Sequence, residues 1–249
     1  MRLLLINPNT SAEITNHIVA VAKAVARPDT EIKGVTGRFG ARYILTRAAA
    51  AVAAHAALDA YAREGAGADA SVLACFGDPG LEGLRELARV PVVGMAEASC
   101  HMAVTLGTRF AIVTGGRRWG PMLEEYVTAI GLGHNLAAVK TLTLSGAEIA
   151  ANPNAALDQL TDACLSTVTD HGAEAVILGG AGLAGIANRI VDRVPVPLVD
   201  CVAAAVFAAE GMARLGPWKA LEGSHAPTQP VPTIGLGAEL GALMERSTP

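Results

Sequence analysis

The 249-residue sequence is poor in the patterns that mark metal sites and nucleic-acid binding. Its four cysteines form no Cys-x-x-Cys pair and its six histidines no His-x-x-x-His pair, so we expect no dedicated metal site. Charged residues make up only 17% of the chain, the net charge is -4, and lysines and arginines do not cluster. This charge pattern argues against nucleic acid as a partner.

Long hydrophobic runs are also missing. Hydrophobic residues reach 51%, but many are alanine, and no uninterrupted stretch is long enough to cross a bilayer. The opening run at residues 1–6 is too short for a secretory signal, and no small-residue cleavage site follows it. We therefore expect a cytoplasmic protein with free thiols and no membrane partner.

Short apolar runs alternate with helix-like segments along most of the chain. This rhythm predicts a parallel sheet with helices on both faces. Strands are predicted at residues 3–6, 31–35, 70–74, 90–95, 110–113, 137–144, 175–178 and 194–199, and helices at 11–26, 48–65, 81–89, 122–130, 155–171 and 201–214. A last strand is expected at 232–236, in a tail that packs on the first half.

The two halves of the chain repeat one another. Residues 67–70 (GADA) precede an apolar run that ends in Cys75, and residues 172–175 (GAEA), 105 positions later, precede one that ends at Gly180. An internal duplication explains this match. We predict one domain from residues 1–97 plus 206–249, carrying Cys75, and a second from residues 98–205, carrying Gly180. Two such halves facing each other place both positions at one cleft.

Polar residues follow the first strand of each half. Asn7 and Asn9 come directly after one strand and Thr114 ends the other, so their side chains are expected to face a ligand at the carboxyl ends of the sheets. Thr10 and Glu13 fit a capping box at the start of the next helix.

Cys75 ends a buried strand and is followed by residues that favour the start of a helix. Asp78 is a good N-cap and Pro79 a good first helical residue. A helix beginning there directs its positive end at the sulfur and favours the thiolate. Burial as an ordinary small core residue is the alternative.

Other candidate residues carry weaker signals. Three cysteines lie in alanine- and valine-rich helical stretches and are assigned to the core. His101 is a weak candidate for the cleft. Arg117 and Arg118 are candidates for contacting a substrate carboxylate, with solvated side chains as the alternative, so their roles are left open. The assigned core cysteines are Cys100, Cys164 and Cys201.

The second half also contains a G-x-G-x-x-G pattern. Gly180, Gly182 and Gly185 follow a predicted strand, and Asp200 closes the next one, as in a dinucleotide-binding module. Only 49 residues follow Asp200, too few for the remaining strands of such a module. We prefer a use of this loop in which its backbone N–H groups contact an oxyanion.

Four motifs, at residues 7–11, 74–80, 91–94 and 178–182, together resemble the aspartate/glutamate/hydantoin racemase superfamily, and most closely its hydantoin and allantoin racemases. The resemblance spans nearly the whole chain. It implies two pseudo-symmetric flavodoxin-like α/β domains, each with about four parallel strands, an active site between them, and a homo-oligomer. It also implies catalysis without a cofactor by two cysteines, of which the first matches Cys75 and the second falls at Gly180.

Two activities follow from this resemblance. The first is racemisation of 5-substituted hydantoins or allantoin, impaired by Gly180, in which one thiol removes a proton and another returns it. The second is decarboxylation of prochiral malonates by one cysteine, as in arylmalonate decarboxylase, although that relative retains the second cysteine. The residues expected to bind the small-molecule substrate are Asn9, Phe76, Gly77, Asp78, Thr114, Ala181 and Gly182.

Overall fold

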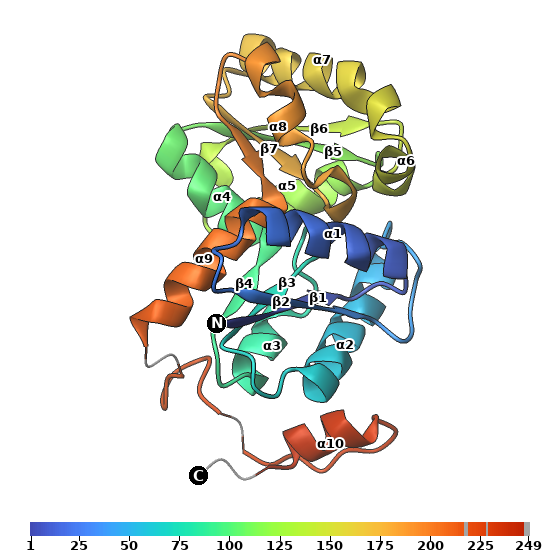
Figure 1. Ribbon diagram of the computed structural model, residues 1–249, viewed down its shortest axis with the longest axis vertical. Helices are drawn as coiled ribbons and strands as arrows, with labels where there is room; N and C mark the ends of the chain where they lie inside the picture. The colour runs from blue at the N-terminus through green and yellow to red at the C-terminus, as the bar shows by residue number, and fades with distance from the viewer. Residues whose placement is uncertain (217–218, 228, 247–249) are drawn as a thin grey trace.

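Two four-stranded parallel sheets form the frame of the protein (Figure 1). The computed structural model describes residues 1–216, 219–227 and 229–246. The first sheet contains β1 Arg2–Asn7, β2 Glu31–Thr36, β3 Ala70–Leu73 and β4 Val92–Gly94, and the second contains β5 Phe110–Gly115, β6 Leu136–Leu142, β7 Ala175–Gly179 and β8 Leu198–Asp200. The strand orders, β2-β1-β3-β4 and β6-β5-β7-β8, are the same. The predicted pair of α/β sheets is therefore confirmed, and the shared order supports an internal duplication.

Helices cover both faces of each sheet (Figure 1). The helices α2 and α3 lie on the outer face of the first sheet, α7 and α8 lie on the outer face of the second, and α1, α4 and α9 lie between the sheets. The helices are α1 Ala12–Val25, α2 Arg47–Glu64, α3 Leu81–Leu87, α4 Met95–Leu106, α5 Trp119–Ala129, α6 Gly146–Ala151, α7 Pro153–His171, α8 Ala187–Ile190, α9 Cys201–Leu215 and α10 Ala238–Met244. Within the described ranges, no helix has the length and apolar character needed to span a bilayer.

One continuous apolar core lies between the two sheets. It contains Leu3 and Leu5 of β1 together with Ile112 of β5 and Ile177 of β7, all at most 1% exposed. The alternate residues of β1, such as Leu4, face a separate cluster under α2 and α3, as the two-residue period of a strand requires. Because both sheets pack into the same core, the ends of their strands are held in fixed relative positions.

The C-terminal tail packs on the first half, as predicted. Leu240 of α10 is 1% exposed, α10 contacts α2, and the Lys219 ammonium donates to the carbonyl oxygens of Arg85 and Glu86 at the end of α3, 2.7 Å from each. The predicted strand at 232–236 is wrong. This segment is irregular, because no strand of either sheet offers it a hydrogen-bonding partner.

The predicted domain boundaries fall inside helices. The strands β1–β4 lie within residues 1–97 and β5–β8 within 98–205, but α4 crosses the first boundary and α9 crosses the second. Both helices lie in the shared core. These two helices pack against both sheets. The division into one domain of residues 1–97 plus 206–249 and a second of residues 98–205 stays a prediction.

Candidate functional site

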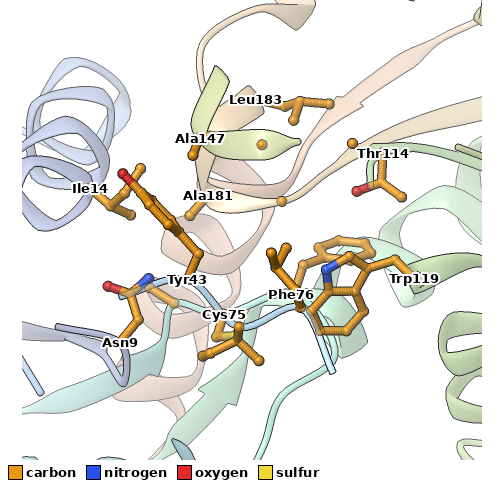
Figure 2. Close-up of a pocket in the computed structure, with 17 residues that line it drawn as sticks. Asn9, Ile14, Tyr43, Cys75, Phe76, Thr114, Trp119, Ala147, Ala181 and Leu183 are labelled. Carbon is orange, nitrogen blue, oxygen red and sulfur yellow. The ribbon is translucent and has the colours of Figure 1, made fainter. Parts of the chain in front are cut away.

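A small cavity of about 90 Å³ lies where the carboxyl ends of the two sheets meet (Figure 2). Figure 2 shows Cys75 and Phe76 on one side of this cavity and Ala147, Ala181 and Leu183 on the other. Seven predicted site residues line it: Asn9, Cys75, Phe76, Thr114, Gly180, Ala181 and Gly182. Gly77 and Asp78, predicted to bind substrate, do not line it. Each half thus contributes its strand ends to one site.

Cys75 follows β3 at the floor of the cavity and is 9% exposed. Its neighbours are apolar and include Ile44, Ala53 and Trp119. Burial, helped by the negative charge of Asp78, raises the pKa of the Cys75 thiol well above its usual range. The predicted lowering by a helix N-terminus is therefore wrong. This environment favours the neutral thiol over the thiolate.

Asp78 does not cap the helix that follows it. That helix, α3, begins at Leu81 with Gly80 as its N-cap, so the predicted cap by Asp78 with Pro79 as first residue is wrong. The Asp78 carboxylate instead accepts hydrogen bonds from two backbone N–H groups at the start of α4, those of Ala96 at 3.0 Å and Glu97 at 2.9 Å. Burial raises the pKa of Asp78 to about 6, against the lowering effect of its hydrogen-bond donors.

The two asparagines after β1 have different roles. Asn7 is 1% exposed and its amide nitrogen donates to Asn9, Ser11 and Thr15, so the predicted ligand contact of Asn7 is wrong. The Asn9 side-chain oxygen accepts from Asn7 and from the Ser11 N–H. With that oxygen occupied, the amide nitrogen of Asn9 is the group left to face the cavity.

The helix α1 starts one residue later than the predicted capping box. Ser11 is its N-cap and accepts from the Ile14 N–H at 3.4 Å, while its hydroxyl donates to Glu13 at 2.8 Å. The Thr10 N–H donates to the Ala41 carbonyl oxygen in the neighbouring loop. Thr10 therefore fixes the loop at residues 37–46 rather than the helix.

Gly180, from the second half, lines the same cavity as Cys75 and has a backbone conformation that favours glycine. Its φ is +124°, in the region that side chains rarely adopt. A Cβ atom at this position would lie 3.5 Å from the Thr114 hydroxyl oxygen and 3.7 Å from Leu183, which are ordinary contacts. The space for a side chain exists, and the backbone is what resists one. Cys201 is 0% exposed and does not line the cavity; its thiol donates to the Gly180 carbonyl oxygen at 3.6 Å.

The loop after β7 does not have the geometry of a dinucleotide site. The helix that follows, α8, has only four residues. In a dinucleotide site, Asp200 would bind the ribose hydroxyl groups. Its carboxylate here accepts hydrogen bonds from the Gly185 N–H, at 2.5 Å, and from the N–H groups of Val202 and Ala203 at the start of α9. The backbone N–H groups of Ala181 and Gly182, the first two residues of the 3₁₀ turn Ala181–Leu183, take no part in the hydrogen bonds of that turn, and both residues line the cavity.

Gly182 is required by a close approach between two backbones. A Cβ atom at 182 would collide with the Gly146 carbonyl oxygen at the start of α6, whereas a Cβ atom at 146 would meet nothing within 4 Å. We expect Gly182→Ala to lower the free energy of unfolding by about 2 kcal/mol, because a backbone atom must move, and Gly146→Ala to change it by less than about 0.5 kcal/mol. Urea unfolding of both variants checks this; equal stabilities would contradict the assigned contact.

The cavity wall is neutral and largely apolar, and Cys75 is the thiol that lines it among the described residues. In the part of the chain that the structure describes, no Lys, Arg, His, Asp or Glu lines it. The weaker candidates His101, Arg117 and Arg118 are exposed and lie elsewhere. Residues 1–216, 219–227 and 229–246 also contain no group of three His, Cys, Asp or Glu side chains that could hold a metal ion.

Several lining residues were not found by sequence reasoning. The loop at residues 37–46 contributes Tyr43, Ile44 and Leu45, and α5 contributes Trp119. The loop at residues 37–46 is held by an ion pair of 2.7 Å between its Arg38 and the buried carboxylate of Asp59 in α2. No local motif marks these side chains, since long-range packing places them over the strand ends.

Comparisons with known proteins agree with this geometry. The Asp/Glu/Hydantoin racemase family matches residues 3–209. A hydantoin racemase of Pseudomonas sp. (strain NS671) is 35% identical over 217 residues, 87% of each chain. The crystal structure of allantoin racemase from Pseudomonas fluorescens superposes with a TM-score of 0.91 at 36% identity, over 94% of this chain and 100% of that one. Arylmalonate decarboxylase shares the fold alone, with a TM-score of 0.61 at 17% identity over 87% of this chain and 94% of that one.

Proposed function

The chain belongs to the Asp/Glu/hydantoin racemase family, and from that premise we propose that it transfers protons at the stereocentre of 5-substituted hydantoins or allantoin without a cofactor. Cys75 is the proposed acid and base on one face of the substrate. Gly180 leaves the other face without a thiol. The protein is thus a racemase-type isomerase whose proton transfer is confined mainly to the Cys75 face.

The observation that carries this proposal is a single buried thiol in a cavity without ionised side chains. Among the lining residues within the described ranges, none has a cationic group to hold a carboxylate. A hydantoin or allantoin ring is neutral, and its amide groups match the donors and acceptors of a polar but uncharged wall. The same wall disfavours substrates that carry one or two carboxylates.

Catalysis at this site requires that charge on the substrate oxygen be stabilised. Removing the proton next to a carbonyl places negative charge on that oxygen, and preorganised N–H donors stabilise it. The proposed donors are the backbone amides of Phe76, Ala181 and Gly182 and the side chains of Asn9 and Thr114, all at the cavity wall. The apolar surroundings strengthen each of these hydrogen bonds.

The cycle begins when the resting thiol of Cys75 gives its proton to solvent water. On the Cys75 face, the thiolate then takes the proton of the substrate carbon and becomes the thiol. This thiol exchanges its proton with solvent and returns a solvent-derived proton to the same face. This cycle exchanges the substrate hydrogen and keeps the configuration. Inversion requires a donor on the opposite face, where Gly180 supplies none.

Deuterium exchange tests the proposal. In D₂O, one enantiomer of 5-benzylhydantoin or allantoin is expected to gain deuterium at its stereocentre without inverting, and the other enantiomer is expected to exchange far more slowly. Proton NMR and chiral chromatography measure the two quantities. Equal exchange of both enantiomers would contradict the one-faced mechanism, and no exchange with any hydantoin would contradict the substrate class.

Decarboxylation of prochiral malonates is the second candidate. A single neutral thiol is suited to delivering one proton after carbon dioxide leaves, and this observation favours it. The uncharged wall counts against it, because a malonate brings two carboxylates. Release of carbon dioxide from phenylmalonate, at a rate abolished by Cys75→Ser, would support it; no release removes it. The homo-oligomeric state and the cytoplasmic location stay predictions.

A further inference from the structure

One face of α5, in the second half, holds the loop of the first half that carries Cys75. We call residues 75–80 the thiol loop. Trp119 and Tyr126 are seven residues apart, two helical turns, and so lie on the same face of α5. The Trp119 ring lies 3.0 Å from the place that a Cβ atom at Gly77 would occupy, and the Tyr126 hydroxyl donates to Asp78 at 2.5 Å. Both contacts join the two halves.

Asp78 is the point at which this loop is tied. It is 4% exposed and has a φ of +47°, a left-handed conformation that is strained for a residue other than glycine. Its N–H donates to the Cys75 carbonyl oxygen at 2.9 Å, which fixes the turn after the thiol. Gly94 allows the carboxylate to approach, since a Cβ atom there would collide with it.

The Tyr126 bond is not explained by helix capping. The two backbone N–H groups at the start of α4 already donate to the Asp78 carboxylate, and this cap lies within the first half. The hydroxyl of Tyr126 adds a third donor from an element of the second half. The neighbouring charged side chains, Arg85 and Glu97, are engaged with each other and do not compete for this position.

We propose that Asp78 and Tyr126 are positioning residues for Cys75, forming a clasp that sets the place of the thiol against the opposite wall of the cavity. The expected effect of this clasp on turnover rests on the proposed function. Cys75 lies on the first half and the amides of Ala181 and Gly182 on the second, so a bond between the halves beside the thiol loop fixes their separation. A displacement of about 1 Å in such a geometry lowers the rate by about 10²-fold.

Tyr126→Phe tests the clasp, because it removes one hydroxyl and keeps the ring. The matched control is Tyr61→Phe. Tyr61 is a buried tyrosine of α2 whose hydroxyl is hydrogen-bonded to the Arg89 backbone, and it does not line the cavity. We expect Tyr126→Phe to lower kcat for deuterium exchange by about 10-fold to 10²-fold with KM changed by less than about 3-fold. Tyr61→Phe is expected to leave both constants near those of the unmodified protein.

A second readout needs no substrate. Cys75 is 9% exposed and the other three cysteines are 0% exposed, so iodoacetamide labelling followed by peptide mass spectrometry reports on the thiol loop. Tyr126→Phe is expected to raise the labelling rate of Cys75 by about 10-fold. The reason is that losing one hydrogen bond to a carboxylate makes local opening of the thiol loop more frequent. Tyr61→Phe is expected to leave it unchanged.

The two readouts separate the clasp from the proposed function. If no hydantoin exchanges but Tyr126→Phe accelerates labelling, the proposed function fails and the clasp stands. If exchange is present and Tyr126→Phe matches Tyr61→Phe in kcat and in labelling, the clasp is overturned. Equal loss of melting temperature in both variants, with kcat and labelling unchanged, also overturns it, because Tyr126 is then structural only.

Discussion

Replacing Cys75 with serine is expected to slow deuterium exchange at the substrate stereocentre by about 10³-fold, within the range of a lost general acid or base. Serine keeps the size and position of the side chain at the end of β3, so substrate binding is expected to persist. A buried hydroxyl does not exchange its proton with a carbon acid at a comparable rate, since its conjugate base is far less accessible than a thiolate. Proton NMR in D₂O measures the loss directly.

Cys201→Ser is the matched control for this substitution. Cys201 is a buried thiol that donates to the Gly180 carbonyl oxygen, and a serine hydroxyl can make the same bond. We expect its exchange rate to stay within about 3-fold of the unmodified protein. If Cys75→Ser retained most of the activity while Cys201→Ser lost it, the assignment of the reactive thiol would be wrong.

Much of the fold could be predicted from sequence because the inner strands β1, β3, β5 and β7 are buried along almost their whole length. Runs such as residues 3–6 and 110–113 read as continuous apolar segments, which parallel strands under helices require. The echo between the halves predicted that Cys75 and Gly180 occupy equivalent strand ends. The identical strand orders explain why these two positions lie at one cavity.

The roles of Asp78 and Asn7 could not be predicted, for a common reason. Local rules pair an N-cap residue with the helix that follows it in sequence. The Asp78 carboxylate instead caps α4, where it accepts a hydrogen bond from the N–H of Ala96, eighteen residues further along the chain. Asn7 follows a strand that ends at the cavity, but its amide turns inward to Ser11 and Thr15. In each case a partner brought close by the tertiary fold replaces the one suggested by sequence order.

The same limit explains the error about the thiol. The sequence around Cys75 suggested a helix N-terminus and a lowered pKa, but the thiol loop turns through left-handed residues and brings a buried carboxylate near the sulfur instead. A buried carboxylate behind the apolar wall opposes the thiolate. This environment favours the neutral thiol as the resting form of Cys75. In the proposed mechanism, the lack of a second thiol at Gly180 decides the stereochemistry.

Gly180→Cys is expected to create inversion where the unmodified protein shows exchange alone. A side chain at 180 has room, because the nearest atoms to its Cβ would be the Thr114 oxygen at 3.5 Å and Leu183 at 3.7 Å. A thiol there faces the substrate from the side opposite Cys75, so a proton removed on one face can be replaced on the other. Chiral chromatography of a single enantiomer of 5-benzylhydantoin measures the inversion.

The gain in inversion is expected to come with a loss of stability. At φ +124° any side chain strains the backbone, and we expect both Gly180→Cys and Gly180→Ala to lower the free energy of unfolding by about 1–3 kcal/mol. Gly180→Ala therefore controls for strain: it shares the destabilisation and gains no inversion. If folded Gly180→Cys inverted no faster than Gly180→Ala while Cys75-dependent exchange persisted, the face at residue 180 would not be the face on which inversion depends, and the two-sided geometry inferred from the duplicated sheets would be wrong.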